Sequence, residues 1–309
     1  MDAEKLREQF YNATITELRK PHDDLMVLRV RPDWPIPAFE PGQYTVLGLG
    51  AWEPRLPGTQ PERDEGPPSR LIRRAYSISC PLLDDAGRLV TVDELDFLEF
   101  YVALVRRSVE RPPALTPRLF TRRPGDRLYC GNRIRGTYTL RHVRPQDTVV
   151  FAATGTGEAP HNAMIAQLLK RGHRPPIVAV TSVRYRRDLA YLQTHRRLQE
   201  LFDNYRYLPL TTREPENLDP SHPRFVGKRH LQDYFESGAF ERDAGITLDP
   251  RNTHVFLCGN PQMVGAPVPG PDGKKVFPAP KGMVQVLTER GFNIDRPNAP
   301  GNIHFERFW

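Results

Sequence analysis

The 309-residue sequence changes character near residue 145, and this change constrains the fold more than any other feature. Before it, short apolar or alternating segments are separated by turn residues and lack helical periodicity. After it, strand-like segments alternate with segments whose apolar residues recur at helical spacing. The sequence therefore predicts two domains: an antiparallel barrel or sandwich, followed by a doubly wound parallel sheet with helices.

The first half contains six predicted strands. They cover residues 13–19, 25–30, 44–49, 75–80, 97–105 and 127–130. A polar insert with five prolines occupies residues 53–70. Its length predicts a surface loop that acts as a functional flap or is locally mobile.

The second half begins with a predicted strand over residues 148–153, which runs into Thr154-Gly155-Thr156-Gly157 and a helix over 160–171. Further strands are expected at 177–180, 205–210 and 254–258, and further helices at 189–202, 229–237 and 283–290. A second proline-rich surface insert covers 265–281. Ligands are expected at the carboxyl ends of the parallel strands.

Composition excludes several classes of protein. The chain has 44 Lys and Arg residues against 37 Asp and Glu residues, which gives a formal charge of +7. Three widely spaced cysteines provide neither a disulfide framework nor an iron-sulfur cluster, which fits a reducing cytoplasm. The nine histidines lack metal-binding spacings, so no metal is expected. The sequence has no signal peptide or long apolar stretch, so neither export nor membrane insertion is expected.

The positions of the arginines argue against a nucleic-acid binder, because they gather at strand ends rather than along a helix interleaved with aromatic residues. Three arginine pairs stand apart from these: Arg106-Arg107, Arg122-Arg123 and Arg196-Arg197. They are interpreted either as solvated faces or as a docking surface for an acidic protein.

Three short motifs have residues suited to nucleotide chemistry. The glycine turn 154–157 lets the backbone approach a phosphate at a helix N-terminus, although a plain βα turn has the same pattern. Arg74-Ala75-Tyr76-Ser77 provides a cation, an aromatic ring and a hydroxyl on a predicted strand, although this motif taken alone fits an exposed strand with a core tyrosine better. Cys258-Gly259-Asn260-Pro261 ends a buried strand, where an inert cysteine is the alternative.

In this order and spacing, the three motifs resemble the ferredoxin–NADP reductase family, and its bacterial ferredoxin/flavodoxin reductase branch in particular. The resemblance covers nearly the whole chain. It extends to residues 39–44, 98–102, 115–119, 124–126 and the carboxyl end 302–309. It implies an antiparallel β-barrel FAD domain over residues 1–143. An α/β doubly wound parallel-sheet NADP domain with an aromatic C-terminal tail would follow over 144–309.

The resemblance also implies roles for individual residues. Arg74 would pair with the FAD pyrophosphate, Tyr76 would stack on the flavin and Ser77 would hydrogen-bond near its N5. Contacts to FAD would also come from Tyr101, Val102, Leu115, Thr116 and Pro117. Thr154, Gly155, Thr156 and Gly157 would bind the nucleotides, with Cys258 facing the nicotinamide. Phe308 and Trp309 would cover the flavin or its adenine, and Glu306 would be the acidic residue near the reacting rings. Ser77, Cys258 and Glu306 are thus the expected catalytic residues.

The choice of pyridine nucleotide depends on arginines that follow the next two strands. Arg184 and Arg213 would meet a 2′-phosphate, which predicts NADP, although a solvated arginine-rich helix start is the alternative.

Two residues depart from the family pattern. Glu158 stands where a small apolar residue is usual and would oppose a bound phosphate, so we expect the nucleotide to sit slightly differently. The terminal Phe308 lacks the usual tyrosine hydroxyl.

The predicted function is hydride transfer between NADPH and FAD, with single electrons exchanged with a separate ferredoxin or flavodoxin. We expect a monomer in the cytoplasm. Two related alternatives are a reductase that serves an oxygenase and a flavin reductase. A non-catalytic nucleotide-binding regulator is a third, with Glu158 as the residue that suggests it.

Overall fold

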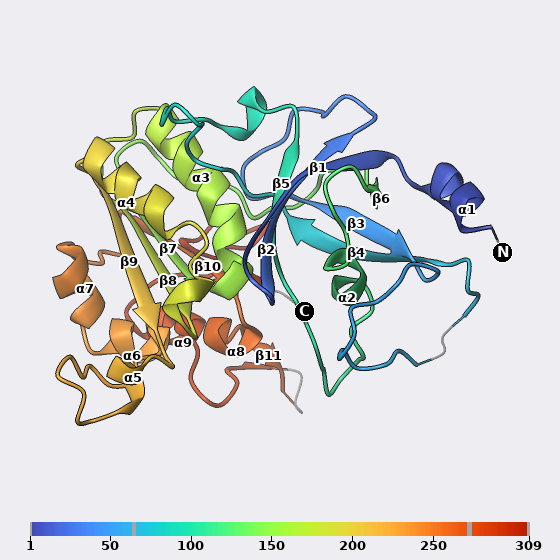
Figure 1. Cartoon of the computed structure of the whole chain (residues 1–309). Coiled ribbons are helices and arrows are strands. Elements are labelled where there is room, and N and C mark those ends of the chain that lie inside the picture. Colours follow the sequence, from blue (N-terminus) through green and yellow to red (C-terminus); the bar gives the residue numbers. More distant parts are fainter. Residues whose placement is uncertain (1, 64–65, 271–273, 308–309) are drawn as a thin grey trace. The chain divides into compact units, whose positions relative to one another are not determined.

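The chain divides into two compact units in the computed structural model, which describes residues 2–63, 66–270 and 274–307. The first unit is Met1–Thr137 and the second is Tyr138–Trp309. Figure 1 shows the strands of the first unit and the sheet and helices of the second. Which cofactor each unit binds stays a prediction.

The first unit is a six-stranded antiparallel sheet, as predicted. Its strands are β1 (Ala13–His22), β2 (Leu25–Pro32), β3 (Tyr44–Gly50), β4 (Leu71–Ser77), β5 (Leu98–Ala103) and β6 (Arg127–Cys130), and its helices are α1 (Ala3–Phe10) and α2 (Thr116–Leu119). The strand order is β4-β3-β6-β1-β2-β5. Apolar side chains such as Ile15, Leu28, Leu47 and Phe100 fill its core, and each of these four is fully buried.

Two elements of this unit differ from the sequence prediction. Strand β4 begins at Leu71 and ends at Ser77, whereas residues 75–80 were predicted, because residues 71–74 pair with β3 from Leu47 to Gly50. Helix α1 was not predicted. The Asp2 carboxylate accepts a hydrogen bond from the Glu4 backbone N–H at 3.1 Å and so caps its first turn.

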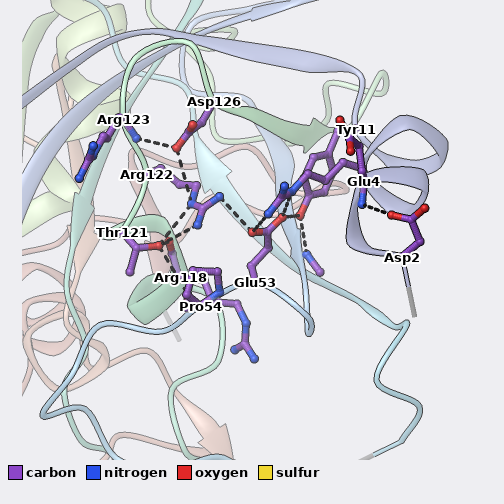
Figure 2. Close-up of polar contacts among 12 residues, drawn as sticks. Asp2, Glu4, Tyr11, Glu53, Pro54, Arg118, Thr121, Arg122, Arg123 and Asp126 are labelled. Carbon is purple, nitrogen blue, oxygen red and sulfur yellow. Dashed lines mark hydrogen bonds and ion pairs between the residues drawn. The ribbon is translucent and has the colours of Figure 1, made fainter.

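The insert over residues 53–70 is anchored by two carboxylates, one buried and one half-buried. The Glu53 side chain is fully buried and accepts hydrogen bonds from Arg7 and Arg122 and from the Tyr11 hydroxyl (Figure 2). The Glu62 carboxylate accepts a hydrogen bond at 2.8 Å from Arg118, whose side chain is 3% exposed. The insert is therefore tied to the rest of the first unit at Glu53 and at Glu62.

The second unit is a five-stranded parallel sheet with helices, also as predicted. Its strands are β7 (Thr148–Thr154), β8 (Ile177–Val183), β9 (Tyr205–Thr211), β10 (Thr253–Gly259) and β13 (Ile303–Arg307). Its helices are α3 (Glu158–Lys170), α4 (Leu192–Leu201), α5 (Pro215–Leu218), α6 (Leu231–Glu236), α7 (Ala239–Ala244), α8 (Pro261–Val264) and α9 (Met283–Glu289). The order β13-β10-β7-β8-β9 puts the point where the strand order reverses between β7 and β10.

Apolar residues from α6, α7 and α9 pack with Val150, Val180 and Leu257 in one core cluster of this unit. The predicted helix 229–237 lies within a stretch that forms two helices, α6 and α7, because Gly238 adopts a left-handed conformation (φ +70°) between them. Strand β13 was not predicted, since its residues were interpreted only as part of a tail. No helix among the described residues is long and apolar enough to cross a membrane.

The second insert, residues 265–281, is closed at its base by two glycines. A Cβ atom on Gly265 would lie 2.4 Å from the Gly282 Cα, so neither position has room for a side chain. Within the insert, β11 (Val268–Pro269) pairs with β12 (Lys275–Val276).

Candidate active site

The glycine turn and the cysteine motif meet at the reversal point of the parallel sheet. Gly155–Gly157 form a short 3-10 turn after β7, and Asn260 follows β10 beside it. The Thr154 hydroxyl oxygen accepts a hydrogen bond from the Asn260 backbone N–H at 2.8 Å. The structure thus brings these two sequence motifs together at the edge where such sheets bind ligands.

Glycine is required here for two separate physical reasons. A Cβ on Gly157 would lie 2.3 Å from the Cys258 carbonyl oxygen, so the turn can pack against β10 only without a side chain. Gly155 has φ +53°, and no atom of a described residue lies within 4 Å of the position that its Cβ would take, so these residues leave open space above the turn. No side chain caps the amino end of α3. These features fit a backbone cradle for a phosphate-bearing ligand.

Cys258 and Glu306 lie on neighbouring parallel strands, because β10 and β13 pair them directly. The Cys258 side chain is fully buried. Burial, together with the charge of Glu306, raises the pKa of the Cys258 thiol well above its ordinary value. Cys258 is therefore a neutral thiol and not a thiolate nucleophile.

A buried tyrosine and histidine near Cys258 were not singled out from the sequence. The Tyr138 hydroxyl lies 2.7 Å from His161 Nε2, and both residues are buried. Burial, together with the charge of Glu306, raises the pKa of Tyr138 well above its ordinary value. Burial lowers the pKa of His161 to about 3, so His161 stays neutral at physiological pH. The sequence signal that could have identified these two residues is a polar side chain at a position that suits a core residue.

The predicted 2′-phosphate arginines come together at the carboxyl ends of β8 and β9. The Arg213 backbone N–H donates to the Arg184 carbonyl at 2.8 Å, and both side chains are exposed. The partner of Arg184 is Asp188, at a distance of 3.8 Å. Both guanidinium groups are thus accessible to an anion.

The same edge of the sheet has a hollow of about 300 Å³ that the sequence did not reveal. Three arginines line it: Arg186, Arg224 and Arg229. Arg186 pairs with Glu216 at 2.7 Å. Its side chain is 55% exposed and so also faces solvent.

Glu158 does not extend toward the open space above the turn. Its side chain is buried and its Oε1 accepts hydrogen bonds from the Tyr207 hydroxyl at 2.7 Å and the Thr181 hydroxyl at 3.0 Å. The carboxylate therefore lies among residues of β8 and β9, inside the unit.

In the first unit, Arg74, Tyr76 and Ser77 lie on β4 beside β3. Arg74 pairs with Leu47 in register, and its exposed guanidinium donates to the Arg73 carbonyl at 2.8 Å. The Tyr76 ring contacts Phe100 edge to face at 6.4 Å between centroids. Ser77 is buried. Tyr76 thus has the core contact that the alternative interpretation expected, while Arg74 has no carboxylate partner among the described residues.

A basic hollow of about 300 Å³ adjoins Arg74. Five arginines line it: Arg63, Arg70, Arg73, Arg74 and Arg111. Glu62 also lines it, but this carboxylate is paired with Arg118. The arginine excess suits an anion with several phosphate oxygens. Arg63 and Arg70 come from the insert, so no family motif pointed to them.

The other predicted FAD contacts are mainly core residues. Tyr101, Val102 and Leu115 are buried, and Val102 and Leu115 belong to the apolar core of the first unit. Pro117 is buried in the first turn of α2, where the Thr116 hydroxyl accepts a hydrogen bond from the Val105 N–H at 3.2 Å. The chain just before this segment, at Pro112 and Ala114, lines the basic hollow. Val102 and Leu115 can therefore contribute through their backbone rather than their side chains.

Two groups of sequence predictions have other outcomes. Phe308 and Trp309 lie outside the described residues. Both predictions for Arg122, a solvated residue or a docking residue, are wrong, because its side chain is 9% exposed and pairs with Glu53.

Comparisons with known proteins agree with this geometry. Residues 151–267 match the family described as the oxidoreductase NAD-binding domain. The chain is 29% identical over 255 residues to a flavodoxin/ferredoxin–NADP reductase of Escherichia coli (strain K12), covering 81% of this chain and 85% of the relative. It is 27% identical over 265 residues to a ferredoxin–NADP reductase of Azotobacter vinelandii, covering 82% and 87%.

The fold has solved counterparts. A ferredoxin–NADP⁺ reductase from Neisseria gonorrhoeae with bound FAD and NADP superposes with a TM-score of 0.71 at 20% identity, covering 96% of this chain and 98% of that one. The similarity to this structure shows the fold. The sequence relatives agree with the predicted resemblance: the chain has an oxidoreductase NAD-binding domain and is similar over about four fifths of its length to ferredoxin–NADP and flavodoxin/ferredoxin–NADP reductases.

Proposed function

We propose that the protein binds FAD in its first unit and NADPH in its second, and that it moves electrons between NADPH and a separate ferredoxin or flavodoxin. The observation that carries this proposal is the glycine turn packed on Cys258–Gly259 at the reversal point of the sheet, with exposed arginines at the ends of the next two strands. The first part suits a nucleotide phosphate backbone, and the second suits a 2′-phosphate.

The first unit fits FAD through its basic hollow. Arg74 faces it together with arginines from the insert and from residue 111. A pyrophosphate needs several charge-assisted hydrogen bonds, and these guanidinium groups, of which Arg70 also lies 3.9 Å from Glu62, provide them. Tyr76 and Ser77, the next residues on the same strand, are then the groups that orient the ring system.

The second unit fits NADPH because Arg184 and Arg213 are held together by a backbone hydrogen bond and remain exposed. Their two cations would bind the 2′-phosphate, which NADH lacks. The backbone N–H groups of Gly155 and its neighbours would receive the pyrophosphate, where the absence of a side chain leaves room. Thr156 and Gly157 complete this turn.

FAD, when bound, supplies the hydride acceptor and releases electrons one at a time. The chain's own part is placement and electrostatics. Cys258 presents a neutral thiol that excludes water and contacts a flat ring without attacking it, since its pKa is raised. Glu306 keeps a carboxylate beside that thiol on β13. Phe308 and Trp309 follow directly in the sequence and are proposed to cover the flavin.

The partner and the setting complete the proposal. The formal charge of +7 suits an acidic electron carrier, because complementary charge accelerates encounter. All three cysteines are free and buried, which fits a reducing cytoplasm. We propose that the protein acts there as a monomer.

The test is anaerobic reduction of the host's purified ferredoxins and flavodoxins by NADPH, followed by their visible spectra. The proposal predicts carrier reduction that requires the protein and bound FAD. Two outcomes would contradict it. Reduction of only free flavin would favour a flavin reductase, and reduction of only an oxygenase component would favour the oxygenase-serving alternative.

A further inference from the structure

A buried polar cluster around Glu158 lies directly behind the glycine turn. Glu158 is the first residue of α3 and is 2% exposed. Its Oε1 accepts hydrogen bonds from Thr181 on β8 and Tyr207 on β9. No side chain donates to its Oε2, which is also buried. Hydroxyl donors that converge on one carboxylate oxygen suit an anion.

His195 of α4 completes the cluster. Its Nε2 lies 3.2 Å from Glu158 Oε1, without the alignment of a hydrogen bond. Its Nδ1 lies 2.7 Å from the Tyr205 hydroxyl, and its ring stacks on Tyr207 with the centroids 4.1 Å apart. With the Tyr205 hydroxyl as donor, the His195 hydrogen resides on Nε2, the ring nitrogen nearer the carboxylate. The charge of Glu158 is thus held in place by three different elements.

The position of this charge has an electrostatic consequence. The amino end of a helix attracts anions because its N–H groups are unpaired and its dipole is positive there. Glu158 lies in that first turn, and its buried charge is screened less by solvent than a surface charge. The charge of Glu158 therefore weakens the attraction between the turn and a bound anion. The side chain cannot rotate away, because its hydrogen bonds to Thr181 and Tyr207 hold it in place.

We infer that Glu158 weakens the binding of the nucleotide pyrophosphate, so that a pyridine nucleotide reaches useful affinity only when its 2′-phosphate also engages the exposed arginines. This inference rests on the proposed function of the second unit. Pyrophosphate binding is common to NADP⁺ and NAD⁺, so Glu158 lowers both affinities by the same factor. The preference between them comes from Arg184 and Arg213. Because Glu158 weakens pyrophosphate binding, it lowers the affinity for NAD⁺, which has no 2′-phosphate to compensate, until NAD⁺ is ineffective.

The test is calorimetric titration of wild type and Glu158→Gln with three ligands: NADP⁺, NAD⁺ and adenosine 2′-monophosphate. The amide keeps the size and an acceptor oxygen but removes the charge. We expect NADP⁺ and NAD⁺ to bind about three- to tenfold more tightly, by the same factor, and the monophosphate to be unchanged because it lacks a pyrophosphate. Glu158→Leu, which restores an apolar residue, should shift the affinities in the same direction.

Tyr207→Phe is the matched control, since it removes one donor but leaves the charge. Its affinity for NAD⁺ should stay equal to wild type or become weaker. The inference is overturned if Glu158→Gln leaves NADP⁺ and NAD⁺ unchanged, if the monophosphate tightens equally, or if Tyr207→Phe tightens NAD⁺. Failure of the proposed function is distinguishable, because wild type would then bind neither NADP⁺ nor the monophosphate.

Discussion

Replacing Glu53 by Gln should destabilise the first unit more than any surface charge change of the same kind. Glu53 is fully buried at the start of the insert, and its two oxygens accept hydrogen bonds from Arg7, Tyr11 and Arg122 (Figure 2). Burial alone would raise the pKa of Glu53, but Arg7, Tyr11 and Arg122 outweigh it and lower the pKa. The carboxylate is thus ionised at neutral pH and pairs with two cations.

The magnitude follows from what the substitution leaves behind. Removing one member of a buried ion pair costs about 3–5 kcal/mol. The Arg7 side chain is 43% exposed and can recover hydration, whereas the Arg122 side chain is 9% exposed and cannot. A glutamine also keeps one acceptor oxygen. We therefore expect a loss of about 2–3 kcal/mol in the free energy of unfolding.

Urea unfolding followed by tryptophan fluorescence measures this loss. Trp34 and Trp52 belong to the first unit, and the Trp52 ring stacks on Tyr11 at 6.1 Å, next to the substituted carboxylate. The transition midpoint should fall while the slope stays constant. In acid the difference from wild type should shrink. A carboxylate with a lowered pKa contributes stability above its unfolded pKa of 4.5 and loses it as pH falls through the folded value.

Glu17→Gln is the control, because Glu17 also pairs with an arginine, Arg29, but its side chain is 51% exposed. It should cost less than about 1 kcal/mol. A Glu53→Gln loss as small as this, or one that is the same at acidic and neutral pH, would refute the reasoning.

Three further predictions concern the proposed sites. Arg184→Ala combined with Arg213→Ala should weaken NADPH binding about 30- to 100-fold and leave NADH nearly unchanged, since the lost cations meet only the 2′-phosphate; equal losses in titrations would contradict the assignment. Arg63→Ala combined with Arg70→Ala should weaken FAD binding by about tenfold, measured by flavin fluorescence quenching, whereas Arg88→Ala, outside the hollow, should not. Burial lowers the pKa of His161 from 6.5 to about 3, so its contribution to stability is present above pH 6.5 and is lost as pH falls toward 3. Between pH 6.5 and 3, His161→Phe should therefore lose less of its free energy of unfolding than wild type does. If acid lowers the free energy of unfolding equally in both proteins, burial of His161 is not the cause.

Much of the fold could be predicted because its signals are local. The run Thr148–Ala153 followed by Thr154-Gly155-Thr156-Gly157 predicts a strand, a turn and a helix from neighbouring residues alone, and the structure has them there. Regular alternation of strands and helices then predicts the parallel sheet. The meeting of Gly157 with Cys258 follows, because parallel strands align their carboxyl ends.

The remaining features depend on contacts between distant residues, which local patterns do not encode. Strand β13 is short and exists through pairing with β10. Glu158 was expected to oppose a bound phosphate, and only the positions of Thr181 and Tyr207 explain why its side chain turns inward. Local patterns likewise do not show that Glu53 and Glu62 of the insert pair with Arg122 and Arg118, which are distant in sequence. Arg122 is a further example, since it was expected to be solvated or to dock a partner but pairs with the buried Glu53.

The most direct test of the account is anaerobic mixing of the purified protein with NADPH while the flavin absorbance is recorded. The account predicts one bound FAD per chain whose visible absorbance bleaches on addition of NADPH and recovers when an oxidised ferredoxin or flavodoxin is added. A colourless protein that takes up no FAD, or a bound flavin that NADPH leaves oxidised, would contradict it.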